Sequence, residues 1–151
     1  MKLLILGATG PTGRHAVDLA LRAGDSVTAF VRNPAALDDL ADQVSLATGD
    51  ATSHRDVSAA MAGQDAVVAA LGRGRSVVAD DFDESIRSSG LDWTLVYPTR
   101  LTHGPAKGTY RAGDRLPMKG NPTISRTDVA AFMHQAAHGR EWIHRTAVIS
   151  D

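Results

Sequence analysis

A glycine-rich turn near the start of the chain constrains the fold most. The stretch LGATGPTGRHAV places Gly7, Gly10 and Gly13 after the apolar run 2–6 and before a segment with helical periodicity. In such a strand–turn–helix unit the first glycine permits the sharp exit from the strand. The second lets the backbone approach a pyrophosphate, and the third lets the helix pack on the strand. The GxxGxxG spacing differs from the commonest GxGxxG fingerprint, so the flanking strand and helix carry the prediction of a nucleotide-binding loop.

The rest of the chain repeats this alternation of strand and helix. Continuous apolar runs, typical of strands covered on both faces, occupy residues 2–6, 26–31, 43–47, 65–71, 92–97 and 146–150. Helical patterns with capping residues and glycine stops occupy residues 14–24, 33–41, 53–63, 77–90 and 125–139. Together they predict an α/β, Rossmann-like, three-layer doubly wound parallel sheet of about five to six strands.

Composition limits the number of domains and the classes of partner. With 151 residues and 43% hydrophobic content, we expect a single domain over 1–151. The formal net charge is −1, and charges of both signs are mixed along the chain, so no basic patch indicates binding to nucleic acid or to an anionic membrane. The chain contains no cysteine. No run approaches the ~18 apolar residues of a membrane span, and the first apolar run is too short for a signal peptide. We therefore predict a cytoplasmic protein with no nucleic-acid and no membrane partner.

The end of the second expected strand bears on the choice of cofactor. NAD binding favours an acidic residue there, whereas the 2′-phosphate of NADP favours arginine. In AFVRNP this position is Arg32, so we predict that NADPH is preferred over NADH, with Arg14 as a second cation. The alternative is an ordinary exposed arginine at the end of a strand.

Three polar side chains near the expected site have two interpretations each. The hydroxyls of Thr9 and Thr12 either reach phosphate oxygens or cap the first helix. In TGDAT, Asp50 either accepts from the adenine amino group, while the Ala51 amide donates to a ring nitrogen, or caps the next helix. The sequence leaves both pairs of alternatives open.

Several motifs in order resemble one known family. GATGPTG, VRNP, GDAT, DAVVAALG, SGLDWTLVYPTRLTHGP and ISRTDVAAFM look like the NAD(P)H-binding, NmrA-like branch of the atypical short-chain dehydrogenase/reductases, which contains flavin reductase/biliverdin-IXβ reductase. The resemblance implies a Rossmann domain that uses NADPH. It also implies a set of cofactor-binding residues: Gly7, Thr9, Gly10, Pro11, Thr12 and Gly13 at the pyrophosphate, Arg32 at the 2′-phosphate, Asp50 and Ala51 at the adenine, Leu71 and Gly72 at the ribose, and Pro98, Thr99, Arg100 and Leu101 beside the nicotinamide.

One departure from that family concerns the middle of the chain. Its members usually have an additional helix and strand between the stretches that match AALG and ADDFDESIRSSG, where this chain has only RGRSVV. A βαβ unit occupies ~30 residues, so a whole structural step is missing. The remaining strands could still close with 92–97 beside 65–71, and a second copy of the chain could fill the vacated sheet edge as a homodimer. Arg73 and Arg75 either replace lost cofactor contacts or form a solvated loop.

Catalytic side chains are few. The Tyr-x-x-x-Lys pair of ordinary short-chain dehydrogenases is absent, since Leu101 and Asp114 stand four residues after Tyr97 and Tyr110. The sequence also lacks the Gly-x-Ser-x-Gly motif that carries the nucleophilic serine of α/β-hydrolases. His103, in the loop after the fifth expected strand, is the one histidine near the expected nicotinamide. It is either a proton donor or an ordinary loop histidine.

Two other histidines have the spacing of a metal chelate. His134 and His138 lie four residues apart on one face of the last expected helix. The sequence around them offers no nearby acidic third ligand and no zinc-protease motif. We therefore predict no metal site there, and two histidines on a solvated helix face.

Two functions fit these observations. The first is an NADPH-dependent oxidoreductase that transfers hydride to a flavin or similar planar acceptor, a reaction in which the cofactor carries the chemistry and no protein acid is required. The second is a catalytically inactive NADP(H)-binding protein, a redox sensor or an interaction module. NADPH consumption in the presence of riboflavin phosphate separates the two.

Overall fold

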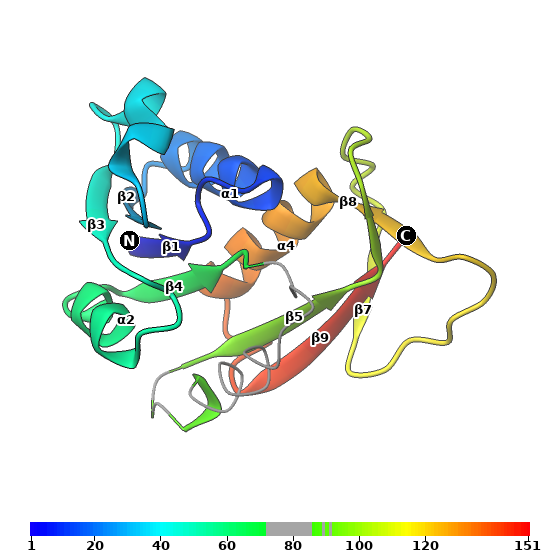
Figure 1. Ribbon diagram of the computed structural model, residues 1–151. Helices are drawn as coiled ribbons and strands as arrows, with labels where there is room; N and C mark the ends of the chain where they lie inside the picture. The colour runs from blue at the N-terminus through cyan, green and yellow to red at the C-terminus, as the bar shows by residue number, and fades with distance from the viewer. Residues whose placement is uncertain (72–85, 89, 91) are drawn as a thin grey trace.

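A computed structural model describes residues 1–71, 86–88, 90 and 92–151, and its centre is a parallel four-stranded sheet (Figure 1). The strands, in the spatial order β3-β2-β1-β4, are β1 (Lys2–Leu6), β2 (Ser26–Val31), β3 (Ser45–Thr48) and β4 (Ala66–Ala69). In the register, Ile5 lies opposite Ala29 on one side and Val68 on the other. Because every pairing is parallel, the carboxyl ends of the four strands meet at one edge.

Helices cover both faces of this sheet. The α-helices that lie wholly within the described ranges are α1 (Pro11–Arg22), α2 (His54–Met61) and α4 (Arg126–His138). Alternate side chains of β1 point to opposite faces, so Leu3 and Ile5 pack in the core under α1 and α4, while Leu4 and Leu6 pack against α2. These three layers confirm the predicted doubly wound α/β class.

The C-terminal half adds two small ladders. Their strands are β5 (Thr94–Pro98), β9 (Arg145–Ser150) and β7 (Arg111–Gly113) in one ladder, and β6 (Arg100–Thr102) and β8 (Thr123–Ser125) in the other. All six predicted strands are present, but four form the main sheet, and β5 pairs in parallel with β9. Within the described ranges, the prediction that 92–97 lies beside 65–71 in one ladder is therefore wrong. Instead α4 packs against both β4 and β5 and joins the two parts.

The predicted helix caps are present, with one change of helix type. Ser53 and Ser125 accept from the amides of Asp56 and Asp128, as their serine-to-aspartate spacing predicts. The segment after β2 forms the 3₁₀ helix η1 (Pro34–Leu40) in place of an α-helix. Its conformation is interrupted at Leu37, whose fully buried side chain anchors the segment in the core. Of the predicted helix 77–90, only residues 86–88 and 90 are described.

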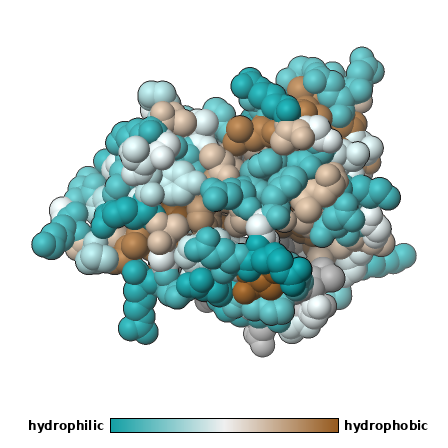
Figure 2. All heavy atoms as spheres, turned by 180° about the vertical axis from the view of Figure 1, so that it is seen from behind, coloured by the Kyte–Doolittle hydropathy of each residue, from teal (hydrophilic) through white to brown (hydrophobic). Residues whose placement is uncertain are grey.

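The surface is mostly polar. Seen from behind, hydrophilic atoms dominate and apolar atoms lie in separate groups (Figure 2). The large apolar side chains that are exposed come from distant segments: Met1, Leu46, Leu71 and Met118. Every helix in the ranges that the structure describes is too short or too polar to cross a membrane.

Candidate functional site

The carboxyl edge of the main sheet gathers most of the predicted cofactor residues. The glycine-rich turn follows β1, Arg32 follows β2, Asp50 lies just beyond β3, and Leu71 lies just beyond β4. A ligand crevice in such a sheet lies where the strand order reverses, which here is between β1 and β4. The loops after these two strands are in contact, because a Cβ added to Gly7 would lie 2.9 Å from the Ala70 carbonyl oxygen and 3.1 Å from Leu71 Cδ2.

The turn requires glycine at two of its three glycine positions. Gly7 has φ +75°, a left-handed conformation that glycine adopts without strain. A Cβ on Gly13 would lie 2.0 Å from the Gly7 carbonyl oxygen, so α1 packs directly on the turn. These contacts confirm the structural roles predicted for the first and third glycines. A Cβ on Gly10 would meet only the Gly7 carbonyl oxygen, at 3.3 Å, so this glycine is not required by packing.

The first turn of α1 is open to an anion. Its N-cap is Gly10, which supplies no side-chain cap, and Pro11 at the first position has no amide hydrogen. Within the described ranges, the amides of Thr12 and Gly13 have no hydrogen-bond partner, and no acidic side chain lies in this turn. Neither Thr9 nor Thr12 caps the helix. Unpaired amides at the positive end of the helix dipole are a suitable cradle for phosphate.

Arg32 and Asp50 both lie at this carboxyl edge of the sheet. Among the described residues the exposed Arg32 guanidinium has no hydrogen-bond or ion-pair partner. Hydrogen bonds from the Thr52 amide and hydroxyl, at 2.9 and 2.8 Å, are the main causes that lower the pKa of Asp50, and the charge of Arg32 adds to them. The cap of α2 is Ser53, so the alternative that Asp50 caps this helix is wrong. Ala51 packs against the cluster on the α2 face.

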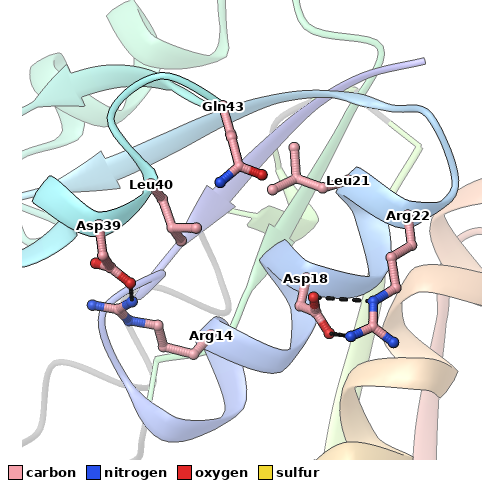
Figure 3. Close-up of a pocket in the computed structure, with 7 residues that line it drawn as sticks. All are labelled: Arg14, Asp18, Leu21, Arg22, Asp39, Leu40 and Gln43. Carbon is pink, nitrogen blue, oxygen red and sulfur yellow. Dashed lines mark hydrogen bonds and ion pairs between the residues drawn. The ribbon is translucent and has the colours of Figure 1, made fainter.

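Arg14, the predicted second cation, is already engaged. It borders a hollow between α1 and η1 (Figure 3) that is lined by Arg14, Asp18, Leu21, Arg22, Asp39, Leu40 and Gln43. The Arg14 guanidinium forms an ion pair with Asp39 and donates to the Ala36 carbonyl oxygen at 2.7 Å. The hydrogen bond from the Arg14 guanidinium to the Asp39 carboxylate is the main cause that lowers the pKa of Asp39. The hollow is therefore an ion-paired groove between two helices, separate from the crevice between β1 and β4.

The stretch predicted to lie beside the nicotinamide is partly used by the fold. Pro98 ends β5, and the Thr99 amide donates to the Ile149 carbonyl oxygen at 3.0 Å. Arg100 and Leu101 start β6, where Leu101 packs against the core and Arg100 is exposed. Fewer backbone groups are thus free here than the resemblance implies. Gly72 lies outside the described residues.

The loop after β6, which carries the exposed His103, is fastened to the start of α4. The buried Asp128 carboxylate accepts from the amides of Lys107 and Gly108, at 2.9 and 3.0 Å, and from the Ser125 hydroxyl at 2.8 Å. Burial alone would raise the pKa of Asp128, but these hydrogen bonds outweigh it and lower the pKa below its ordinary value. The serine-to-aspartate spacing in 125–128 indicates only a helix cap, because nothing in the sequence shows that the loop after β6 contacts the start of α4.

Sequence reasoning missed Arg126. This arginine is the first residue of α4, directly after β8, and Ser125 of β8 lies opposite Thr102 of β6. Its Nη1 atom is buried and has no hydrogen-bond partner in the described part of the chain. Arg126 and His103 each come one residue after the paired Ser125 and Thr102, so the backbone of Arg126 starts beside the loop that carries His103. The arginine was visible in ISRTDVAAFM, but its lack of a partner is a property of the packed structure.

The two chelate-spaced histidines have an acidic partner that the sequence did not show. The Nε2 atoms of His134 and His138 each lie 2.9 Å from Oδ2 of Asp25. The prediction that no acidic third ligand is nearby is therefore wrong. The sequence around the histidines does not show this ligand, because Asp25 is more than 100 residues away along the chain. This cluster lies at the amino edge of the sheet, opposite the carboxyl edge.

Comparisons with known proteins agree with the fold and the glycine-rich turn. Residues 7–83 and 76–139 match the model of a family described as NAD(P)H-binding. A Rossmann-fold NAD(P)-binding family protein from Shigella flexneri is 24% identical, with a TM-score of 0.80 over 98% of this chain and 92% of that chain. An anaerobilin reductase from Escherichia coli O157:H7 is 21% identical, with a TM-score of 0.79 over 99% and 96%. A candidate NAD-dependent epimerase/dehydratase from Bacillus halodurans is 20% identical, with a TM-score of 0.81 over 100% and 94%.

Proposed function

The chain belongs to this NAD(P)H-binding family, and we propose that it binds NADPH at the carboxyl edge of the sheet and reduces a flavin or similar planar small molecule. The observation that carries the proposal is the uncapped start of α1, packed on a glycine-rich turn at the switch point of the sheet. A turn needed only for the fold would not require unpaired amides, whereas a pyrophosphate would accept their hydrogen bonds.

In this proposal each part of the cofactor has its own residues. They are Gly7, Thr9, Gly10, Pro11, Thr12 and Gly13 for the pyrophosphate, Arg32 for the 2′-phosphate, Asp50 and Ala51 for the adenine, Leu71 for the ribose, and Pro98, Thr99, Arg100 and Leu101 near the nicotinamide. The absence of a partner for Arg32 in the described ranges supports NADPH over NADH, because a 2′-phosphate would neutralise this cation. Arg14 contributes less, since Asp39 already holds it.

The chemistry that NADPH supplies when bound is hydride donation, and the chain has to orient the acceptor and exclude water. The buried Nη1 of Arg126, which has no hydrogen-bond partner among the described residues, supports an acceptor with a phosphate or carboxylate group. Riboflavin phosphate is such an acceptor. A linear tetrapyrrole is the second acceptor to test, because one structural neighbour is an anaerobilin reductase. His103 is the candidate proton donor to the reduced acceptor.

A non-catalytic NADP(H)-binding protein is the second candidate function. The family model matches in two segments that meet at residues 76–83, where the sequence lacks the expected helix and strand. In the described ranges β5 also has no ladder with β4. Both observations are consistent with a site that has lost part of its lining on the acceptor side. Such a site would still bind the cofactor but would not turn over an acceptor.

Fluorescence titration with NADPH and NADH tests the cofactor part of the proposal. Arg32→Ala should weaken NADPH binding by about 10- to 100-fold, the loss of one charge-assisted contact, and leave NADH binding unchanged. Arg140→Ala, which removes an exposed arginine just after α4, is the matched control and should change neither affinity. If the wild-type protein binds neither nucleotide, both candidate functions fail.

Steady-state oxidation of NADPH then separates the two functions. The reductase predicts oxidation that saturates with riboflavin phosphate or with a linear tetrapyrrole. Tight NADPH binding without oxidation above background would contradict the reductase and support the non-catalytic binding protein.

A further inference from the structure

Three metal-ligating side chains meet at the amino edge of the main sheet. Asp25 immediately precedes β2, and His134 and His138 lie in the second half of α4. Each histidine Nε2 lies 2.9 Å from the same carboxylate oxygen, Oδ2, and the centroids of the two rings are 4.4 Å apart. All three ligand atoms lie within 4.8 Å of one another. The three side chains therefore converge on one point from two elements of the fold.

The burial of this cluster is graded. The Asp25 side chain is 2% exposed, that of His134 is 21% exposed and that of His138 is 37% exposed. The carboxylate thus lies at the inner end, and the cluster is open to solvent on the side of His138. The other carboxylate oxygen, Oδ1, accepts from the α-amino group of Met1 at 2.9 Å, which leaves Oδ2 for the two imidazoles.

We propose that Asp25, His134 and His138 form a binding site for a divalent transition metal, with Zn²⁺ as the best match. Two imidazole nitrogens and one carboxylate oxygen are a zinc ligand set, and histidines four residues apart on a helix chelate a single ion. Ligand atoms of a tetrahedral zinc site lie about 3.3 Å apart, so the two 2.9 Å contacts would lengthen by only a few tenths of an ångström. Water would complete the coordination from the exposed side.

Both imidazole nitrogens contact Oδ2, because the α-amino group of Met1 occupies Oδ1. This arrangement brings two nitrogens and one oxygen to a place where a single ion could contact all three. The metal would replace the Nε2 protons that now bridge to the carboxylate, and the contact from Met1 to Oδ1 would orient the carboxylate from outside the ligand shell.

The position of the cluster indicates a structural role for the metal. Asp25 belongs to the α1–β2 connection and the histidines belong to α4, so the ion would fasten α4 to the edge of the sheet. The cofactor residues lie at the opposite, carboxyl edge. This inference therefore does not rest on the proposed reductase activity, and its test uses no nucleotide.

The first test is metal binding by tag-free protein that has been treated with a chelator. Titration with Zn²⁺ alone, followed by calorimetry, should give one site per chain. At a free Zn²⁺ concentration of about 100 times Kd, Tm should rise by about 5–10 °C. Co²⁺ should give the visible absorption of a four-coordinate ion. The absence of a stoichiometric site, or a weak six-coordinate Co²⁺ spectrum, would overturn the proposal and leave a hydrogen-bonded cluster.

Matched substitutions locate the site. His134→Gln and His138→Gln should each weaken Zn²⁺ binding by at least about 100-fold, since even partners outside the ligand shell contribute about 10- to 100-fold. His54→Gln, which changes an exposed histidine on α2, should bind as the wild-type protein does. Circular dichroism confirms that each variant folds. Unchanged binding by the His134→Gln/His138→Gln double variant would assign the metal to other histidines and refute the proposal.

Discussion

The two edges of the central sheet differ in how their polar groups are satisfied. At the carboxyl edge, the amides at the start of α1 and the guanidinium of Arg32 have no partner in the described ranges. At the amino edge, both carboxylate oxygens of Asp25 are paired, with Met1, His134 and His138. A buried donor without a partner costs stability, whereas an exposed donor such as the Arg32 guanidinium can bind water until a ligand pairs with it. The comparison thus separates an open edge, whose donors lack partners in the described ranges, from an edge whose side chains hold the molecule together.

The largest effect is expected where the open edge depends on packing. Gly13→Ala would place a methyl group 2.0 Å from the Gly7 carbonyl oxygen, so the turn and α1 must separate. We expect a loss of about 3 kcal/mol or more in the free energy of unfolding, measured with urea, together with loss of NADPH binding. Gly10→Ala is the control, because its methyl group would meet only one atom, at 3.3 Å. It should cost less than about 1 kcal/mol, so an equal loss in both variants would contradict the packing argument.

Asp128 tests how the loop near the open edge is anchored. Its pKa is lowered, so its contribution to stability is fully present above the unfolded pKa of about 3.9 and is lost as pH falls through the folded value. Asp128→Asn should lower the free energy of unfolding by about 1.5–3 kcal/mol at pH 7, and the difference from wild type should shrink below about pH 4. Among the described residues, the charged and titratable groups that interact with Asp128 are Lys107 and Tyr110. Urea unfolding between about pH 7 and 2.5 measures this difference.

The matched control for Asp128 is Asp42→Asn, an exposed aspartate. It should change the free energy of unfolding by less than about 0.5 kcal/mol at any pH in this range. A pH-independent difference between wild type and Asp128→Asn would show that the loop anchor does not depend on the carboxylate charge.

Local features of the fold were readable from the sequence, and long-range ones were not. The turn at Gly7, the caps at Ser53 and Ser125 and the six apolar strands follow from residues that are neighbours in the chain. The partner of a strand or of a histidine depends on tertiary packing. That is why the β5–β9 ladder and the contact from Asp25 to His134 escaped prediction. The three-residue strands are too short to show periodicity.

Arg126 tests whether the open edge extends to the acceptor. Arg126→Met removes a guanidinium whose buried Nη1 atom has no partner in the part of the chain that the structure describes. The free energy of unfolding should therefore stay constant or rise by about 1 kcal/mol. If Arg126 binds the acceptor anion, KM for riboflavin phosphate should rise by about 10-fold, while KM for uncharged riboflavin should change little. An equal change in both KM values would assign Arg126 to the shape of the site and not to anion binding.

The smallest effect concerns the ion pair that holds Arg14. In Asp39→Ala the Arg14 guanidinium loses its carboxylate partner and keeps the Ala36 carbonyl contact. If Arg14 can turn toward the 2′-phosphate, NADPH binding should tighten by about 2- to 5-fold while NADH binding stays the same, because only NADPH carries that phosphate. Asp18→Ala, which frees Arg22 in the same groove, is the control and should change neither affinity. Unchanged NADPH affinity in Asp39→Ala would leave Arg32 as the cation that distinguishes the two cofactors, and would restrict the role of Arg14 to joining α1 to η1.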